Sequence, residues 1–216
     1  MKFKICCIQN EAEALLAQAY GATALGFVSK MPSGPGVIPE SLIAEIINTL
    51  PDTVLSVLLT SETSSSAIIQ QLKFVKTKAV QFVDEIQNIE YQKLKDVLPD
   101  IYIIQVLHVT GLSTVEQAIE KAEFVDVLLL DSGNPALKTK ELGGTGRTHN
   151  WQISRQIRKR IKIPVYLAGG LRPDNIKKAV ETVEPYGIDV CSGIRTNGLL
   201  DEQKLSRFIR EISSYL

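Results

Sequence analysis

The sequence predicts a single (β/α)8 barrel, the TIM-barrel architecture of the α/β class, over residues 1–216. Short apolar runs alternate with amphipathic stretches along the chain, and eight of each occur. Such alternation with short connections is typical of parallel strands, and eight repeats favour a closed barrel over a doubly wound sheet. Glycine-bearing segments also end the last two apolar runs, where barrels of this class place a phosphate site. No linker divides the chain, so we expect one domain.

The expected strands are short runs rich in β-branched and aliphatic residues. In chain order they cover residues 3–8, 24–28, 53–59, 79–82, 102–107, 125–131, 164–168 and 188–191. The expected helices are amphipathic, and they cover residues 11–20, 39–50, 65–74, 88–97, 114–122, 151–161, 173–183 and 201–215. Two connections, residues 29–36 and 132–150, are longer and rich in turn residues, which indicates substrate-contacting loops at the C-terminal rim of the barrel.

Composition argues against several classes of partner. Lys plus Arg and Asp plus Glu both number 24, so the formal charge is zero and no overall field attracts nucleic acid or an anionic membrane. No apolar run approaches the ~20 residues that span a bilayer, and residues 1–6 lack a signal-peptide core. Cys6 and Cys7 are adjacent, which is a poor basis for a disulfide framework with Cys191 as the third cysteine. We therefore expect reduced thiols and a cytoplasmic protein.

Strand alternation separates two sets of side chains in the first strand. Phe3, Ile5 and Cys7 share one face, which suits the helix-facing side because it is apolar. Lys4 and Cys6 then point into the barrel, with Cys6 at the C-terminal mouth where barrel active sites lie. Cys6 is thus a candidate catalytic thiol or an ordinary buried packing residue, and Cys7 is expected to be a packed core thiol.

Two carboxylates are expected to point into the barrel. Asp131 ends an apolar strand in phase with Leu129, and a carboxylate there is costly unless it is hydrated, paired or used. Its alternatives are a catalytic role or a capping, loop-closing hydrogen bond. Asp189 lies lower in the last strand and either contacts a ligand or pairs with Lys4.

The glycine segments predict a phosphate site. Gly169-Gly170 and Ser192-Gly193 follow the last two strands, where uncovered backbone N–H groups and a following helix N-terminus hold a phosphate. The segment containing Gly144 and Gly146 predicts a flap that closes over a phosphorylated ligand. His108 and His149 are the only histidines and form no metal-ligand motif, and no dinucleotide fingerprint follows the first strand. We expect neither a metal nor a cofactor.

In combination these motifs resemble phosphoribosylanthranilate isomerases of tryptophan biosynthesis, and the resemblance runs in order along nearly the whole chain. The segments that carry it are Lys4-Ile5-Cys6, Ala24-Leu25-Gly26-Phe27, Val80-Gln81-Phe82, Leu129-Leu130-Asp131, Gly143-Gly144-Thr145-Gly146-Arg147-Thr148 with Trp151, Leu167-Ala168-Gly169-Gly170-Leu171-Arg172-Pro173-Asp174-Asn175 and Asp189-Val190-Cys191-Ser192-Gly193-Ile194.

The resemblance implies a metal-free (β/α)8 enzyme, a monomer or homodimer, that isomerises a small phosphorylated sugar by an Amadori rearrangement. It implies that Asp131 is the general acid that opens the furanose and that Cys6 is the general base that removes the C2 proton. A cation such as Lys4 would favour the Cys6 thiolate, and an apolar rim would keep Asp131 protonated.

The chain departs from the family pattern on the aglycone side. After Phe27 the family carries an arginine that meets the anthranilate carboxylate, and this chain has none there. Where the family has a glycine after the catalytic cysteine, this chain has Cys7. Where the family has an acidic residue after the last Ser-Gly pair, this chain has Arg195. Either Arg195 or Lys30 replaces the missing arginine, or the chain is a paralogue for another phosphorylated aminosugar, or it is a non-catalytic phosphometabolite-binding barrel.

Overall fold

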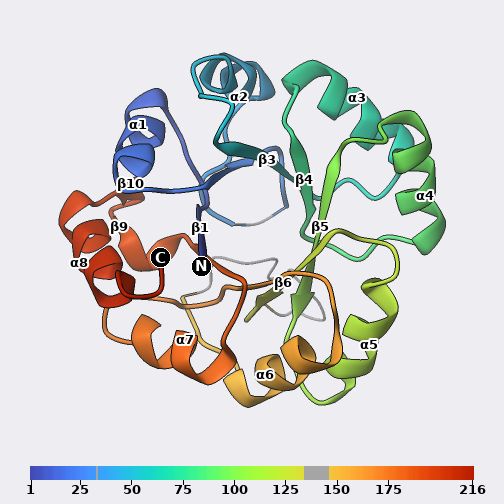
Figure 1. The fold of residues 1–216 in the computed structure, drawn as a ribbon. Helices are drawn as coiled ribbons and strands as arrows, with labels where there is room; N and C mark the ends of the chain where they lie inside the picture. Colours follow the sequence, from blue (N-terminus) through green and yellow to red (C-terminus); the bar gives the residue numbers. More distant parts are fainter. Residues whose placement is uncertain (33, 134–145) are drawn as a thin grey trace.

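The computed structural model describes residues 1–32, 34–133 and 146–216, and these residues form a closed parallel barrel ringed by helices (Figure 1). The barrel strands are β1 (Lys2–Ile5), β2 (Ala24–Val28), β3 (Leu55–Thr60), β4 (Ala79–Phe82), β5 (Tyr102–His108), β6 (Val127–Asp131), β7 (Val165–Leu167) and β8 (Gly187–Val190). The helices are α1 (Glu11–Ala19), α2 (Glu40–Ile47), α3 (Ser65–Val75), α4 (Asn88–Val97), α5 (Ser113–Lys121), α6 (Trp151–Arg160), α7 (Ile176–Val183) and α8 (Glu202–Ile212). The predicted (β/α)8 barrel is therefore confirmed.

Most predicted elements agree with the structure within a few residues, and β2, β4 and α4 agree residue for residue. Side-chain caps start several helices at the expected places, as Asn10, Ser64 and Asp201 accept backbone N–H bonds from the first turns of α1, α3 and α8. The main difference at the N-terminus is that β1 ends at Ile5 instead of Ile8. The segment after β8 also contains a short 3₁₀ helix, η1 (Ser192–Ile194), and an unpredicted hairpin of β9 (Arg195–Thr196) and β10 (Leu199–Leu200).

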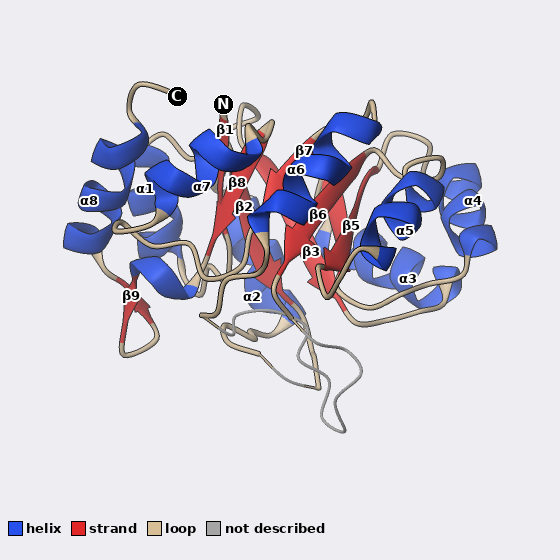
Figure 2. Cartoon of the chain, turned by 90° about the horizontal axis from the view of Figure 1, so that it is seen from below, coloured by secondary structure: helices blue, strands red, loops and turns tan. Residues whose placement is uncertain are grey.

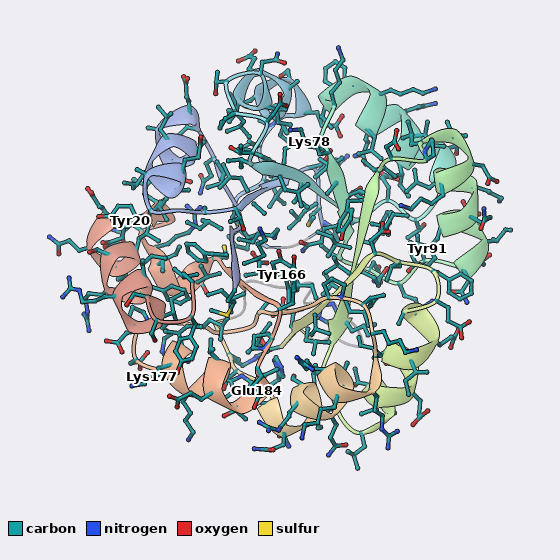
Figure 3. The ribbon with its side chains drawn as sticks, viewed as in Figure 1. Tyr20, Lys78, Tyr91, Tyr166, Lys177 and Glu184 are labelled. Atoms are coloured by element: carbon teal, nitrogen blue, oxygen red, sulfur yellow. The ribbon has the colours of Figure 1, made fainter. Side chains whose placement is uncertain are left out.

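The core has two layers, as the strand alternation predicts. Phe3 and Ile5 are buried between the sheet and the helices, whereas Lys4 and Cys6 lie on the inner side with the residues that fill the barrel. Tyr166 of β7 lies near the centre of the barrel (Figure 3). A Cβ at Gly187 would lie 2.6 Å from the Tyr166 ring, so the missing side chain on β8 makes room for the tyrosine.

The two ends of the barrel differ. The chain termini lie at one end, and the β9–β10 hairpin projects at the other, with the loops that follow the strands (Figure 2). The pairing of β8 with β1 closes the sheet and sets Lys4 opposite Asp189. Among the described residues no helix is long and apolar enough to cross a membrane. The end that carries the hairpin is where sequence analysis places the functional residues.

Candidate active site

A cavity opens at the C-terminal mouth of the barrel, and it brings together residues from segments far apart in the sequence. Two catalytic candidates, Cys6 and Asp131, both line it. Cys6 directly follows β1 and Asp131 ends β6, and these strands are separated by β7 and β8 around the barrel. Other predicted site residues that line the cavity are Gly169, Gly170, Asp189 and Ser192.

Cys6 lies beside a buried cation. A Cβ built on Gly26 would lie 3.1 Å from the Cys6 Sγ and 3.1 Å from the Lys4 Nζ, so both atoms fill the space left by this glycine. Cys6 is 5% exposed and Lys4 is 1% exposed. The Lys4 ammonium and the Cys6 thiol therefore share one buried space inside the barrel.

Cys7 is a buried core residue, as predicted, but it belongs to the cluster inside the barrel, so the predicted helix-facing side was wrong. β1 ends at Ile5, and Cys7 adopts a left-handed backbone conformation with φ of 62°. Strand alternation therefore no longer applies at this position, and Cys7 lines the cavity with Cys6. Its Sγ lies 2.8 Å from the Sγ of Cys191. Left-handed φ favours glycine, which agrees with the family pattern at this position.

Asp131 is a buried carboxyl group with a raised pKa. Burial raises its pKa, and the nearby charge of Asp189 raises it further. The Ser132 backbone N–H donates to Oδ1 at 2.6 Å and, together with His108, opposes part of that rise. The loop-closing hydrogen bond and the cavity position therefore occur together, since Asp131 makes the bond to Ser132 and lines the cavity.

Asp189 pairs with Lys4, as one of the two alternatives predicted. The Lys4 Nζ lies 2.9 Å from the Asp189 Oδ1, and both side chains are buried. Burial alone would lower the pKa of Lys4, but the charges of Asp189 and of the neighbouring thiols outweigh it and raise that pKa. Asp189 also lines the cavity, so the pair links the β8 strand to the surroundings of Cys6.

The glycine segments meet at the mouth, as the sequence predicts. A Cβ at Gly170 would lie 2.5 Å from the backbone of Arg147, and one at Gly146 would lie 3.9 Å from the Ser192 Oγ. A Cβ at Gly193 would lie 1.8 Å from the Leu171 carbonyl oxygen. Three loops therefore approach one another through their glycine backbones. Gly144, the remaining predicted member, lies outside the described residues.

The structure gives Arg195 different partners from those expected. Its guanidinium lies 7% exposed and pairs with Glu13 at 2.9 Å. The Arg195 Nη2 also donates to the carbonyl oxygens of Cys6 at 3.2 Å and Cys7 at 2.6 Å. Arg195 starts the unpredicted hairpin, which aims it back at the β1–α1 turn. Lys30 is exposed, and neither residue lines the cavity.

Sequence analysis missed Gln81 as a functional candidate. This β4 residue is 3% exposed and lines the cavity, and its Oε1 atom has no hydrogen-bond partner among the residues that the structure describes. Alternation would have found it, because Gln81 is the polar residue at an inward position of a strand that is otherwise apolar. An unpaired buried amide costs free energy unless a ligand satisfies it. Other residues on this side of the cavity are mainly apolar: Val28, Met31, Pro35, Leu59 and Val83.

Comparisons with known proteins point to one family. A family model described as N-(5'phosphoribosyl)anthranilate (PRA) isomerase matches residues 3–211. N-(5'-phosphoribosyl)anthranilate isomerases from Nostoc punctiforme and Methanosarcina acetivorans are 34% and 33% identical, with 99% and 98% of this chain and 99% and 92% of those proteins covered. The phosphoribosylanthranilate isomerase structure from Thermotoga maritima matches with a TM-score of 0.85 at 29% identity, covering 99% of each chain. A structure of such an enzyme with reduced 1-(o-carboxyphenylamino)-1-deoxyribulose 5-phosphate matches with a TM-score of 0.83 at 27% identity, again over 99% of each chain.

Proposed function

This chain belongs to the N-(5'-phosphoribosyl)anthranilate isomerase family, and from that premise we propose that it isomerises N-(5'-phosphoribosyl)anthranilate in tryptophan biosynthesis. The observation that carries the proposal is the meeting of Cys6, Asp131 and the glycine loops around one cavity. An Amadori rearrangement needs an acid and a base on one sugar framework, and a phosphate site to hold it.

In the proposed mechanism Asp131 acts first. Its carboxylic acid gives a proton to the furanose ring oxygen, the C1–O bond breaks, and the aglycone nitrogen forms an iminium with C1. Cys6 as thiolate then takes the proton from C2, and the electron pair forms the enolamine that tautomerises to the ketone. The raised pKa of Asp131 supports the acid role, and the position of Lys4 beside Cys6 supports the base role.

The proposed phosphate site consists of the loops of Gly146, Gly169-Gly170 and Ser192-Gly193. Gly169 and Gly170 have φ of 80° and 60°, a conformation that L side chains rarely adopt. Successive N–H groups in such turns form concave sites for anions. The close approach of Gly193 to Leu171 fixes the distance between the two loops.

Replacing Gly193 with Ala tests that site. The added Cβ would overlap the Leu171 carbonyl oxygen, so the loops must separate. We expect a KM for the phosphorylated substrate at least about 10-fold higher, with a stability loss of about 1–3 kcal/mol. Gly111→Ala is the matched control, because a Cβ there meets nothing within 4 Å. An unchanged KM for Gly193→Ala, measured by steady-state kinetics, would count against the phosphate role.

The aglycone side supports a second candidate function. The family arginine is absent, and neither Arg195 nor Lys30 lines the cavity, so no cation from these residues meets an anthranilate carboxylate. The apolar wall suits an aromatic ring, and the Gln81 Oε1 can accept a hydrogen bond from a ligand hydroxyl or amine. A paralogue that isomerises another phosphorylated aminosugar is the alternative that this observation favours.

The deciding experiment follows the loss of phosphoribosylanthranilate fluorescence with purified protein. We expect turnover, together with growth of an auxotroph that lacks the isomerase when it expresses this chain. Absence of both results would reject the anthranilate substrate. Mass spectrometry of small molecules that co-purify with the protein would then identify the phosphorylated aminosugar, and retention of a ligand without turnover would indicate a binding barrel.

The pH dependence of turnover tests the acid role of Asp131. The group must carry its proton to act, and burial raises its pKa, so activity persists above the range of an ordinary carboxyl and falls as pH rises through the raised value. His108 lowers the pKa of Asp131, so His108→Gln should move this alkaline limb to higher pH. A limb that stays in place in His108→Gln would assign it to a different group.

A further inference from the structure

Three thiols gather on one side of the cavity, and the proposed mechanism uses one of them. Cys6, Cys7 and Cys191 all line the cavity. Cys7 follows β1 and Cys191 follows β8, which are neighbouring strands in the barrel. The Sγ atoms of Cys7 and Cys191 lie 2.8 Å apart, although 184 positions separate the two residues in sequence. This contact joins the turn that carries Cys6 to the loop that carries Ser192.

The two sulfurs differ in chemical character. The hydrogen bond between them raises the pKa of Cys7, and Cys6 and burial raise it further. The same hydrogen bond lowers the pKa of Cys191, and the Arg195 charge lowers it further against burial and Asp189. The pKa of Cys191 is thus lowered, whereas the pKa of the neighbouring Cys7 is raised. Cys191 is also only partly buried, whereas Cys7 is 5% exposed.

We propose that Cys7 and Cys191 are an oxidation site that peroxide converts to a reversible disulfide at the mouth of the cavity. The geometry carries this, because the two side chains are already in contact and Cys191 is reachable from the cavity. A bond between the adjacent Cys6 and Cys7 would be strained, which leaves Cys191 as the better partner for Cys7.

The oxidant is hydrogen peroxide, and the step balances in two stages. The Cys191 thiolate attacks one peroxide oxygen, the O–O bond breaks, and sulfenic acid and hydroxide form; the hydroxide takes a proton to become water. The Cys7 sulfur then attacks the sulfenic sulfur, the S–O bond breaks, and its proton leaves with the hydroxyl as a second water. The two thiols lose two electrons in total, and the peroxide accepts them.

The bond would couple two parts of the proposed active site. Cys7 directly follows the proposed base Cys6, and Cys191 directly precedes Ser192 of the proposed phosphate site. A covalent link fixes these two loops to each other, and misplacement of reacting groups by about 1 Å costs about 10²-fold in rate. The effect on turnover rests on the proposed function, whereas the formation of the disulfide does not.

The test uses the full reduced chain treated with hydrogen peroxide. We expect one of the three thiols to remain free, the mass to fall by two hydrogen atoms, and tryptic fragments 5–30 and 179–195 to be joined until dithiothreitol separates them. Turnover should fall at least about 10-fold and return with dithiothreitol. Joined fragments with unchanged turnover would overturn the coupling to activity.

Variants assign the bond, because fragment 5–30 contains both Cys6 and Cys7. Cys7→Gly is the matched control, since glycine suits the φ of 62° at this position. It should give no joined fragments, and Cys191→Ser should give none either. Cys6→Ser should still form the bond, even though the proposed mechanism predicts a kcat about 10²–10⁴-fold lower for this variant. Joined fragments in Cys7→Gly, or their absence from both the full chain and Cys6→Ser, would overturn the proposal.

Discussion

Asp131→Asn should lower kcat by about 10²–10⁴-fold, and Cys6→Ser should lower it by a similar factor. The asparagine keeps the shape of the side chain but cannot give a proton to the ring oxygen. The serine keeps the position but is a far weaker base than a thiolate beside Lys4. Because each variant removes a proton transfer and spares the glycine loops, the KM should change much less than kcat.

Steady-state kinetics on the two single variants and the double variant provide the measurement. Acid and base act in successive steps, so the loss in the double variant should be smaller than the product of the two single losses. Asp100→Asn is the control for a carboxylate change, since Asp100 is exposed and does not line the cavity. A kcat within threefold of the parent for Asp131→Asn would exclude Asp131 as the acid.

The directions of side chains could be predicted from the sequence where the residues lie in regular strands. Alternation in the first strand predicts that Lys4 and Cys6 point inward, and the pairing of β1 with β8 sets Lys4 opposite Asp189. Their ion pair was one of the two alternatives predicted for Asp189, because the first and last strands meet where the barrel closes. The location of the glycine segments could also be predicted, since each follows a predicted strand and therefore lies at the same end of the barrel.

Prediction failed where the backbone leaves the regular pattern. Cys7 lies beyond the end of β1 with φ of 62°, so alternation gives the wrong face for its side chain. Arg195 follows η1 and begins a two-residue strand that no periodic pattern reveals. Its partner Glu13 is 182 positions away in the sequence. Such a contact depends on the folded barrel, and composition or spacing does not indicate it.

Arg195→Met should lower the free energy of unfolding by about 3–5 kcal/mol, because it leaves the Glu13 carboxylate buried without its cation. The pair is bidentate, with Arg195 Nη1 and Nη2 donating to the two Glu13 oxygens at 2.9 and 3.0 Å, and Glu13 is 6% exposed. Chemical denaturation measures the loss. Arg195→Lys should recover part of it, since an ammonium keeps the charge but not the planar fork.

Arg195 also donates hydrogen bonds to the turn that carries the proposed base Cys6. Its loss should therefore lower turnover as well as stability, and a second variant should restore the stability without restoring the turnover. Glu13→Gln combined with Arg195→Met removes both charges and keeps one amide oxygen, which can accept from one of the two backbone N–H groups that Glu13 binds, those of Gln9 and Leu200. We expect the free energy of unfolding to recover relative to Arg195→Met alone, because no lone buried charge remains. Turnover should stay low, because the carbonyl oxygens of Cys6 and Cys7 still lack the guanidinium donor. A double variant that regains full kcat would show that Arg195 supports the fold without positioning Cys6.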